Sequence, residues 1–152
     1  MEIERKFLVR MAPEVEGAVS KRLRQGYLAS GHDGEVRVRD AGGSLTLTVK
    51  TGSGMVRGET EITLTPEQFE ALWPATDGRR VEKVRTLVPV GGRVAELDMY
   101  EGRLAGLRVV EVEFDSTGDA EAFAPPDWFG REVTGDAAYK NASLALKGRP
   151  LD

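Results

Sequence analysis

Acidic side chains recur along this sequence in pairs separated by one residue, and basic side chains do the same in other segments. In a β-strand, residues i and i+2 lie on one face, roughly 6.5 to 7 Å apart. The acidic pairs are Glu2/Glu4, Glu59/Glu61, Glu96/Asp98 and Glu111/Glu113, and the basic pairs are Arg37/Arg39 and Lys83/Arg85, joined by Lys6, Lys50 and Arg57. Like charges at this spacing repel unless a group of opposite sign lies between them. The spacing therefore indicates one site for cations and one for anions.

These residue types suit a polyphosphate and its metal. Carboxylate oxygens, with water and phosphate oxygens, are the ligands that Mg²⁺ or Mn²⁺ prefers. Arginine binds phosphate oxygens in bidentate fashion. If the paired charges face one channel, they form a site for a highly charged polyphosphate. The alternative is an ordinary antiparallel sheet with one solvent-facing side, which also alternates in polarity.

The alternation of polar and apolar residues defines the elements that must position these groups. Val36 and Val38, for example, lie opposite Arg37 and Arg39. The same pattern predicts eight strands, at residues 2–10, 21–28, 35–40, 44–50, 55–65, 81–88, 94–100 and 107–114. Glycine-rich turns at 41–43 and 91–92 join neighbouring strands as hairpins. Hairpin connections favour an antiparallel sheet that closes into a barrel.

Two or three short helices complete the prediction. Thr65, Pro66 and Gln68 form the start signal of a helix, with Thr65 as N-cap and Gln68 completing a capping box. A second short helix is expected around 119–123, an apolar loop at 125–129, and a last helix at about 137–146. The expected fold class is mainly β (α+β), an eight-stranded antiparallel β-barrel that forms a polar tunnel.

The bulk composition limits the kind of protein. A chain of 152 residues that is 40% hydrophobic can bury a core, and we expect one domain over 1–152. A net charge of −4 argues against a surface that binds nucleic acid or anionic lipid throughout. The chain has no cysteine and no apolar run of about 18 residues, so we expect a cytoplasmic protein without a membrane partner. The sequence does not indicate the oligomeric state.

Short motifs in a fixed order give the chain a family resemblance. The segment from Glu2 to Lys6 reads ExExK, and eight further motifs follow it: RQGYL (24–28), VRVR (36–39), TLTVK (46–50), ETEI (59–62), EKVR (82–85), ELDMY (96–100), VEVEF (110–114) and AYKN (138–141). Together they resemble the CYTH superfamily, the triphosphate tunnel metalloenzymes. The segments LWPATDGRRVEK and WFGREVT look most like the small bacterial members, which are inorganic triphosphatases.

The resemblance implies hydrolysis of tripolyphosphate to pyrophosphate and phosphate with Mg²⁺ or Mn²⁺. By motif position, Glu2, Glu4, Glu111 and Glu113 would be the metal ligands, and Glu59, Glu61, Glu96 and Asp98 would be further ligands or groups that support them. The inorganic triphosphate would be held by Lys6, Arg37, Arg39, Lys83 and Arg85, by Arg57 of the same basic set, and by Lys140 from the last helix. Tyr27 and Lys50 match a pair proposed to act together in catalysis.

Phosphoryl transfer to water needs mainly positioning and charge neutralisation. Lys50 could neutralise or protonate the leaving pyrophosphate, and a simple phosphate clamp fits the sequence equally well. Three functions compete: an inorganic triphosphatase, a thiamine triphosphatase or class IV adenylate cyclase, and a polyphosphate- or nucleotide-binding module without turnover. Only 7% of residues are aromatic, and no cluster that could hold an organic ring is obvious.

Overall fold

The fold is built on one antiparallel sheet, described here from a computed structural model of residues 3–52 and 58–150. The strand order is β5-β4-β3-β2-β6-β7-β8-β1-β9. The strands are β1 Ile3–Val9, β2 Ser20–Gly31, β3 Gly34–Ala41, β4 Ser44–Thr51, β5 Gly58–Thr63, β6 Arg80–Val90, β7 Arg93–Tyr100, β8 Arg108–Phe114 and β9 Phe129–Glu132. The mainly β, antiparallel fold predicted from the sequence is confirmed.

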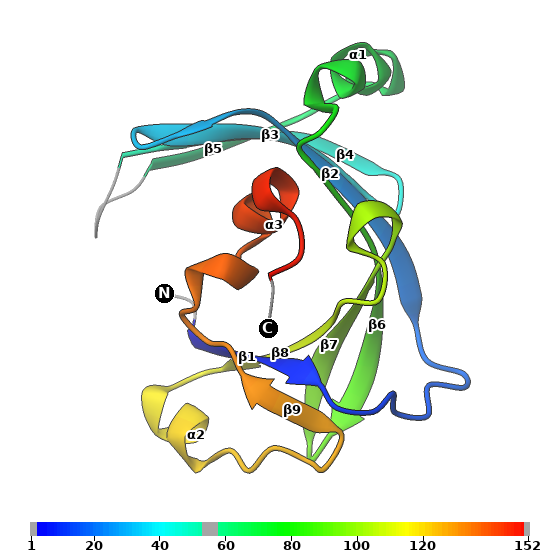
Figure 1. The fold of residues 1–152 in the computed structure, drawn as a ribbon, viewed down its shortest axis with the longest axis vertical. Coiled ribbons are helices and arrows are strands. Elements are labelled where there is room, and N and C mark those ends of the chain that lie inside the picture. The colour runs from blue at the N-terminus through cyan, green and yellow to red at the C-terminus, as the bar shows by residue number, and fades with distance from the viewer. Residues whose placement is uncertain (1–2, 53–57, 151–152) are drawn as a thin grey trace.

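The number of strands and the closure of the sheet differ from the prediction. The eight predicted strands are present in the described residues, and residues 2 and 55–57 of the predicted strands lie outside them. Residues 129–132, whose first residue we assigned to a loop, form a ninth strand beside β1. Phe129 pairs with Val9, and its ring packs 5.0 Å from that of Phe7, so burial of this aromatic contact stabilises the short strand. Within the described residues, no ladder joins the edge strands β5 and β9. The sheet is therefore a strongly curved, open half-tunnel (Figure 1).

The convex face of the sheet carries two apolar cores. Helix α1 (Pro66–Leu72) and the 3₁₀ turn η1 (Trp73–Thr76) cover one end, where Phe69 and Trp73 pack on Val38. The predicted capping box is present: Thr65 N–H donates to Gln68 Oε1 at 2.8 Å, and Gln68 N–H donates to Thr65 Oγ1 at 3.1 Å.

The other convex core lies beneath helix α2 (Thr117–Ala122). Its centre is Phe7 of β1, Leu97 of β7 and Val110 and Val112 of β8, all 2% exposed or less. These residues alternate with charged ones along their strands. Because the apolar residues are buried on the convex face, the charged residues point toward the concave face.

The concave face is partly filled by the C-terminal segment. The turns η2 (Gly102–Leu104) and η3 (Ala137–Tyr139) and the helix α3 (Asn141–Lys147) contribute to this layer, and α3 lies inside the curve of the sheet (Figure 1). Leu144 and Ala145 are buried with Tyr27 and Tyr100. The helix predicted at 137–146 is divided at Lys140, which is in extended conformation and precedes α3. This layer closes part of the half-tunnel and leaves the remainder polar.

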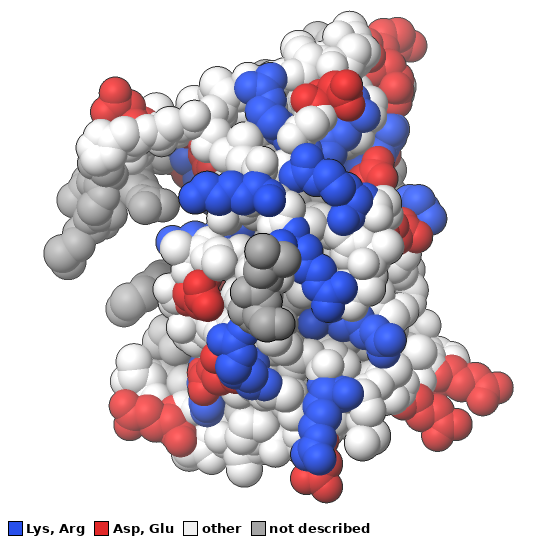
Figure 2. Space-filling view, in the orientation of Figure 1, with Lys and Arg blue, Asp and Glu red and all other residues white. Residues whose placement is uncertain are grey.

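Charge is unevenly distributed on the surface. Figure 2 shows a face on which Lys and Arg gather toward the middle, while Asp and Glu lie mostly toward the edges. Among the described residues, none of the helices has the length and apolar character needed to cross a membrane.

Candidate functional site

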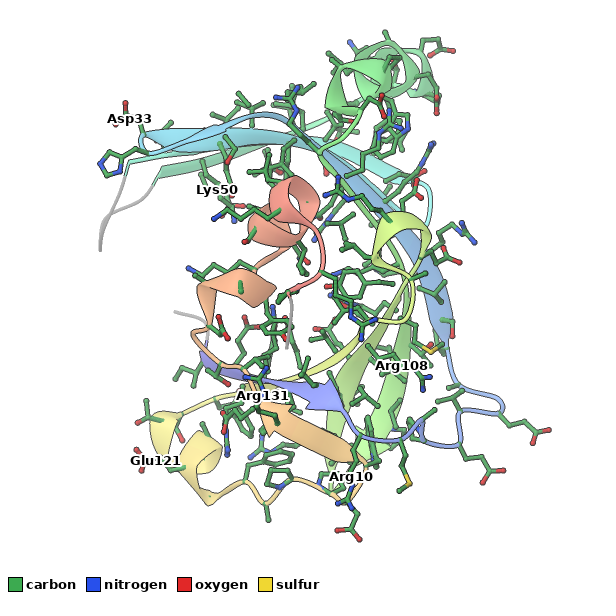
Figure 3. The ribbon with its side chains drawn as sticks, viewed as in Figure 1. Arg10, Asp33, Lys50, Arg108, Glu121 and Arg131 are labelled. Carbon is green, nitrogen blue, oxygen red and sulfur yellow. The ribbon has the colours of Figure 1, made fainter. Side chains whose placement is uncertain are left out.

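The paired charges meet in a cavity of about 660 Å³ on the concave face of the sheet. The predicted site residues that line it are Glu4, Lys6, Tyr27, Arg37, Arg39, Lys50, Glu59, Arg85, Glu96, Glu111, Glu113 and Lys140. Figure 3 shows Lys50 extending from β4 toward the concave side. These charged groups therefore face inward and line one channel. The role assigned to each residue stays a prediction.

One wall of the cavity is acidic and belongs to β1, β8 and β7. Glu4 lies directly opposite Glu113, and Glu111 lies directly opposite Glu96. Carboxylates in such positions repel each other across the strands. Lys6 relieves part of this repulsion, since its Nζ lies 3.1 Å from Glu111 Oε1 and donates to the Tyr139 carbonyl oxygen at 3.1 Å.

The buried end of this wall is less favourable to charge. Burial raises the pKa of Glu96, and the neighbouring acidic groups raise it further. Arg85, whose Nη1 lies 2.9 Å from Glu96 Oε2, acts in the opposite direction and lowers this pKa. A positive ion near these carboxylates would stabilise their charged form.

The donor set fits a hard divalent cation. Its oxygens are carboxylate, the type that Mg²⁺ and Mn²⁺ prefer, and they come from adjacent strands. Among residues 3–52 and 58–150, no three acidic or histidine side chains converge closely enough to chelate an ion by themselves. Mg²⁺ commonly takes one or two carboxylates and completes its shell with water and phosphate oxygens, so Glu4, Glu111 and Glu113 suit a metal shared with a substrate.

The facing wall is basic and belongs to β3. The Arg37 Nε is buried and has no hydrogen-bond partner within the described part of the chain. Burial lowers the pKa of Arg39, and the nearby charges of Arg37 and Arg85 lower it further. Arg39 Nε donates to Gln25 Oε1 at 3.1 Å, a neutral partner. This wall thus presents positive charge that the described residues do not neutralise, which is the condition an anion requires.

The floor of the cavity holds a buried charged cluster on β6 and β7. Arg85 donates to both oxygens of Asp98, at 2.8 and 2.9 Å, and Lys83 Nζ lies 2.8 Å from Asp98 Oδ2. Burial opposes the charge of Asp98, but the Arg85 hydrogen bonds and the Lys83 charge outweigh it and lower its pKa. Burial lowers the pKa of Lys83, which is 2% exposed and lies 5.3 Å from the Tyr100 ring centre. Lys83 and Asp98, predicted to bind substrate and metal, lie beneath the cavity and do not line it.

Tyr27 and Lys50 flank a residue that the sequence analysis did not select. Glu35 lies directly opposite Lys50 across β3 and β4, with Oε1 4.0 Å from Nζ, and it lines the cavity. Burial raises the pKa of Tyr27, and the Glu35 charge adds to that rise. Gln25 Nε2 donates to the Tyr27 hydroxyl at 3.3 Å. In EVRVRD, Glu35 is two residues before Arg37 and therefore lies on the same face of the strand as Arg37 and Arg39. This alternation could have predicted Glu35 from the sequence.

The remaining predicted residues lie toward the open edge. Glu59 of β5 is opposite Lys50, whereas Glu61 accepts a hydrogen bond from Thr48 Oγ1 at 3.3 Å and does not line the cavity. Lys140 is exposed at the start of α3, next to Asn141, which also lines the cavity. Glu2 and Arg57 lie outside the described residues.

Comparison with known proteins agrees with this geometry. The CYTH domain matches residues 1–145. The chain is 51% identical over 148 residues to an inorganic triphosphatase of Nitrosomonas europaea, covering 95% of this chain and 97% of that protein. It is 37% identical over 145 residues to an inorganic triphosphatase of Acetivibrio thermocellus, covering 94% and 92%. A crystal structure of an inorganic triphosphatase superposes with a TM-score of 0.85 at 47% identity, covering 99% of this chain and 97% of that one.

Proposed function

Because the chain belongs to the CYTH family, we propose that it is an inorganic triphosphatase, a hydrolase that converts tripolyphosphate to pyrophosphate and phosphate. Two relatives of this activity each match more than nine-tenths of the chain. The substrate would be a small inorganic polyphosphate bound in the cavity on the concave face of the sheet.

The observation that carries the proposal is that an acidic and a basic wall line one cavity. Carboxylates face one another on the β1–β8 side, and the buried Arg37 Nε on the β3 side has no partner in the described residues. A polyphosphate with a divalent cation brings charges of both signs at once, because its oxygens accept from arginine while the cation faces the carboxylates. A neutral ligand would neutralise neither the carboxylates nor the arginines.

The family consists of metal-dependent enzymes, and the present donor set favours Mg²⁺ or Mn²⁺. Glu4, Glu111 and Glu113 would hold the ion, with Glu2 as a further candidate and Glu59 and Glu96 as neighbouring carboxylates. When bound, the ion neutralises phosphate charge and makes water more acidic.

The chain's own cations would hold the phosphates in line for attack by water. Arg37 and Arg39 offer guanidinium groups from β3, and Arg85 offers one that Asp98 holds in a fixed orientation. Lys6 and Lys140 approach from the opposite side of the cavity. Since phosphoryl transfer depends mainly on positioning and charge stabilisation, this set supplies the principal requirement.

Tyr27 and Lys50 would act near the leaving group in different ways. Because burial raises the pKa of Tyr27, its phenol stays protonated near neutral pH and donates a hydrogen bond to a phosphate oxygen instead of acting as a base. Lys50, beside Glu35, contributes positive charge to the departing pyrophosphate.

An organic triphosphate fits this cavity less well. Tyr27 and His32 are its aromatic lining residues in the described structure, and Tyr27 is 1% exposed. A thiamine or adenine ring needs an apolar or aromatic surface to stack on. The thiamine triphosphatase and adenylate cyclase alternatives are therefore not favoured.

Phosphate release from tripolyphosphate, ATP and thiamine triphosphate tests the proposal. Each substrate is assayed with Mg²⁺, with Mn²⁺ and with excess chelator. We expect tripolyphosphate to have the highest kcat/KM and turnover to stop with chelator. A higher kcat/KM for thiamine triphosphate, a cyclic product from ATP, or no turnover of any substrate would contradict the assignment.

A further inference from the structure

A second cavity lies at the other end of the β1–β8 ribbon. It has a volume of about 530 Å³ and is lined by three arginines, Arg10, Arg108 and Arg149. All three side chains are exposed. Arg10 and Arg108 lie on the same side of the molecule in Figure 3.

The antiparallel register brings two of these arginines together. Leu8 of β1 is opposite Val109 of β8, so Arg10, just after β1, and Arg108, at the start of β8, lie at the same end of the ribbon. Glu4 and Glu113 face each other at its opposite end. Arg10 is six positions after Glu4, which is about 20 Å along an extended strand. The second cavity is therefore distinct from the first.

The third arginine is delivered by the segment after α3. Arg149 crosses over Gly106, where a Cβ atom would lie 2.9 Å from Arg149 Nη1. Gly106 also has a φ of +95°, a conformation that disfavours other residues. The backbone thus leaves room for the guanidinium against the cavity wall.

These three arginines differ from most others in the protein. Arg5, Arg22 and Arg93 each reach a carboxylate, at 2.8, 3.1 and 3.8 Å. Within the described residues, Arg10, Arg108 and Arg149 have neither an ion pair nor a side-chain hydrogen bond. Three cations around one hollow repel each other unless an anion lies between them.

We propose that this cavity is a second anion-binding site, which takes a small phosphate anion of the pyrophosphate type on Arg10, Arg108 and Arg149. Arginine suits such a ligand because its planar fork matches phosphate oxygens in bidentate fashion. The site goes beyond the proposed function, and binding to it requires no turnover.

One residue, Tyr139, connects this site with the first cavity. Tyr139 lines the second cavity, while its carbonyl oxygen accepts a hydrogen bond from Lys6, which lines the first. Lys6 in turn pairs with Glu111. Two contacts, Tyr139–Lys6 and Lys6–Glu111, thus link Tyr139 to the acidic wall.

Calorimetric titration with inorganic pyrophosphate, in about 0.15 M salt and without divalent metal, tests the proposal. The background is the Arg37→Ala/Arg39→Ala protein, in which the first cavity has lost its basic wall. We expect this protein to bind one equivalent of pyrophosphate. When Arg108→Ala/Arg149→Ala is added to it, the affinity for pyrophosphate should fall by about tenfold or more per arginine. Absence of binding in the background protein overturns the proposal.

Two control pairs separate a built site from general attraction. Arg79→Ala/Arg93→Ala makes the same change in net charge at residues that do not line this cavity, and it should leave the affinity within about twofold. Arg108→Lys/Arg149→Lys keeps the charge but removes the bidentate guanidinium groups, so it should still weaken pyrophosphate binding clearly. Equal losses in the Arg79/Arg93 pair, or full affinity in the lysine pair, would refute a specific site.

Discussion

Two groups of cations stand in contrast, one in the floor beneath the first cavity and one on its β3 wall. On β6 and β7, Arg85 and Lys83 share Asp98 at 2.8 to 2.9 Å, and Arg85 also reaches Glu96. On β3, Arg37 and Arg39 have no carboxylate ion pair within the described residues, and the Arg37 Nε has no partner there. The protein neutralises the first group, of which only Arg85 also lines the cavity, whereas the second group is left for a ligand.

The difference separates stability from binding. A buried charge that loses its partner destabilises the fold, whereas an unpaired charge that is removed relieves repulsion. Substitutions on the β6–β7 floor should therefore change the free energy of unfolding, and those on β3 should change substrate affinity and turnover.

Asp98→Asn should have the largest effect, a loss of about 3–5 kcal/mol in the free energy of unfolding, because two buried cations lose their shared carboxylate. Lys83→Met is the matched comparison, since Asp98 then keeps both hydrogen bonds from Arg85. Urea unfolding measures both. Equal losses in the two variants would contradict the role of Asp98 as the shared partner.

Arg37→Ala should lower kcat/KM for tripolyphosphate by about 100- to 1,000-fold, because a preorganised charged donor to the phosphate is lost. The melting temperature should stay the same or rise, since Arg37 lies close enough to Arg39 to lower its pKa. Steady-state kinetics and thermal unfolding check the two parts. A loss of stability with unchanged kinetics would reverse the assignment of this wall.

Glu111→Gln should reduce turnover by about a hundredfold or more through loss of metal binding. Glu61→Gln, which changes an exposed carboxylate outside the cavity lining, serves as its control and should retain most activity. The apparent affinity for Mn²⁺ is measured from the dependence of rate on metal. If both variants respond alike, the acidic wall of β8 is not the metal site.

Glu35→Gln should have the smallest effect, about a tenfold fall in kcat with little change in KM. Glu35 orients Lys50 and is not one of the cations proposed to hold the substrate. The pH dependence of kcat is the second readout, since a structural role would leave its shape unaltered. A change confined to KM would place Glu35 in substrate binding instead.

Alternation in the sequence was sufficient to predict the faces of the sheet. Strict period-2 patterns in EVRVRD and VEVEF put Arg37, Arg39, Glu111 and Glu113 on one side, and the cavity lining has all four. Val112, which alternates with Glu111 and Glu113, is fully buried on the other side. Parity is reliable here because a one-residue slip would expose an entire apolar face.

Depth along the channel and closure of the sheet depend on contacts between distant segments. Lys83 and Arg85 have the same parity, but Lys83 lies beside Tyr100 under the layer formed by Leu144 and Ala145. Strand β9 forms because Phe129 meets Phe7, more than a hundred residues earlier in the chain. Neither contact leaves a local signature in the sequence.

A crystal structure with tripolyphosphate and Mn²⁺ bound tests the central claim most directly, since anomalous scattering locates the metal independently of the phosphates. The account predicts a manganese peak beside Glu4, Glu111 or Glu113, with phosphate oxygens accepting from Arg37 and Arg39 across the same cavity. Manganese bound away from these carboxylates, or a triphosphate that leaves Arg37 without a partner, would contradict it.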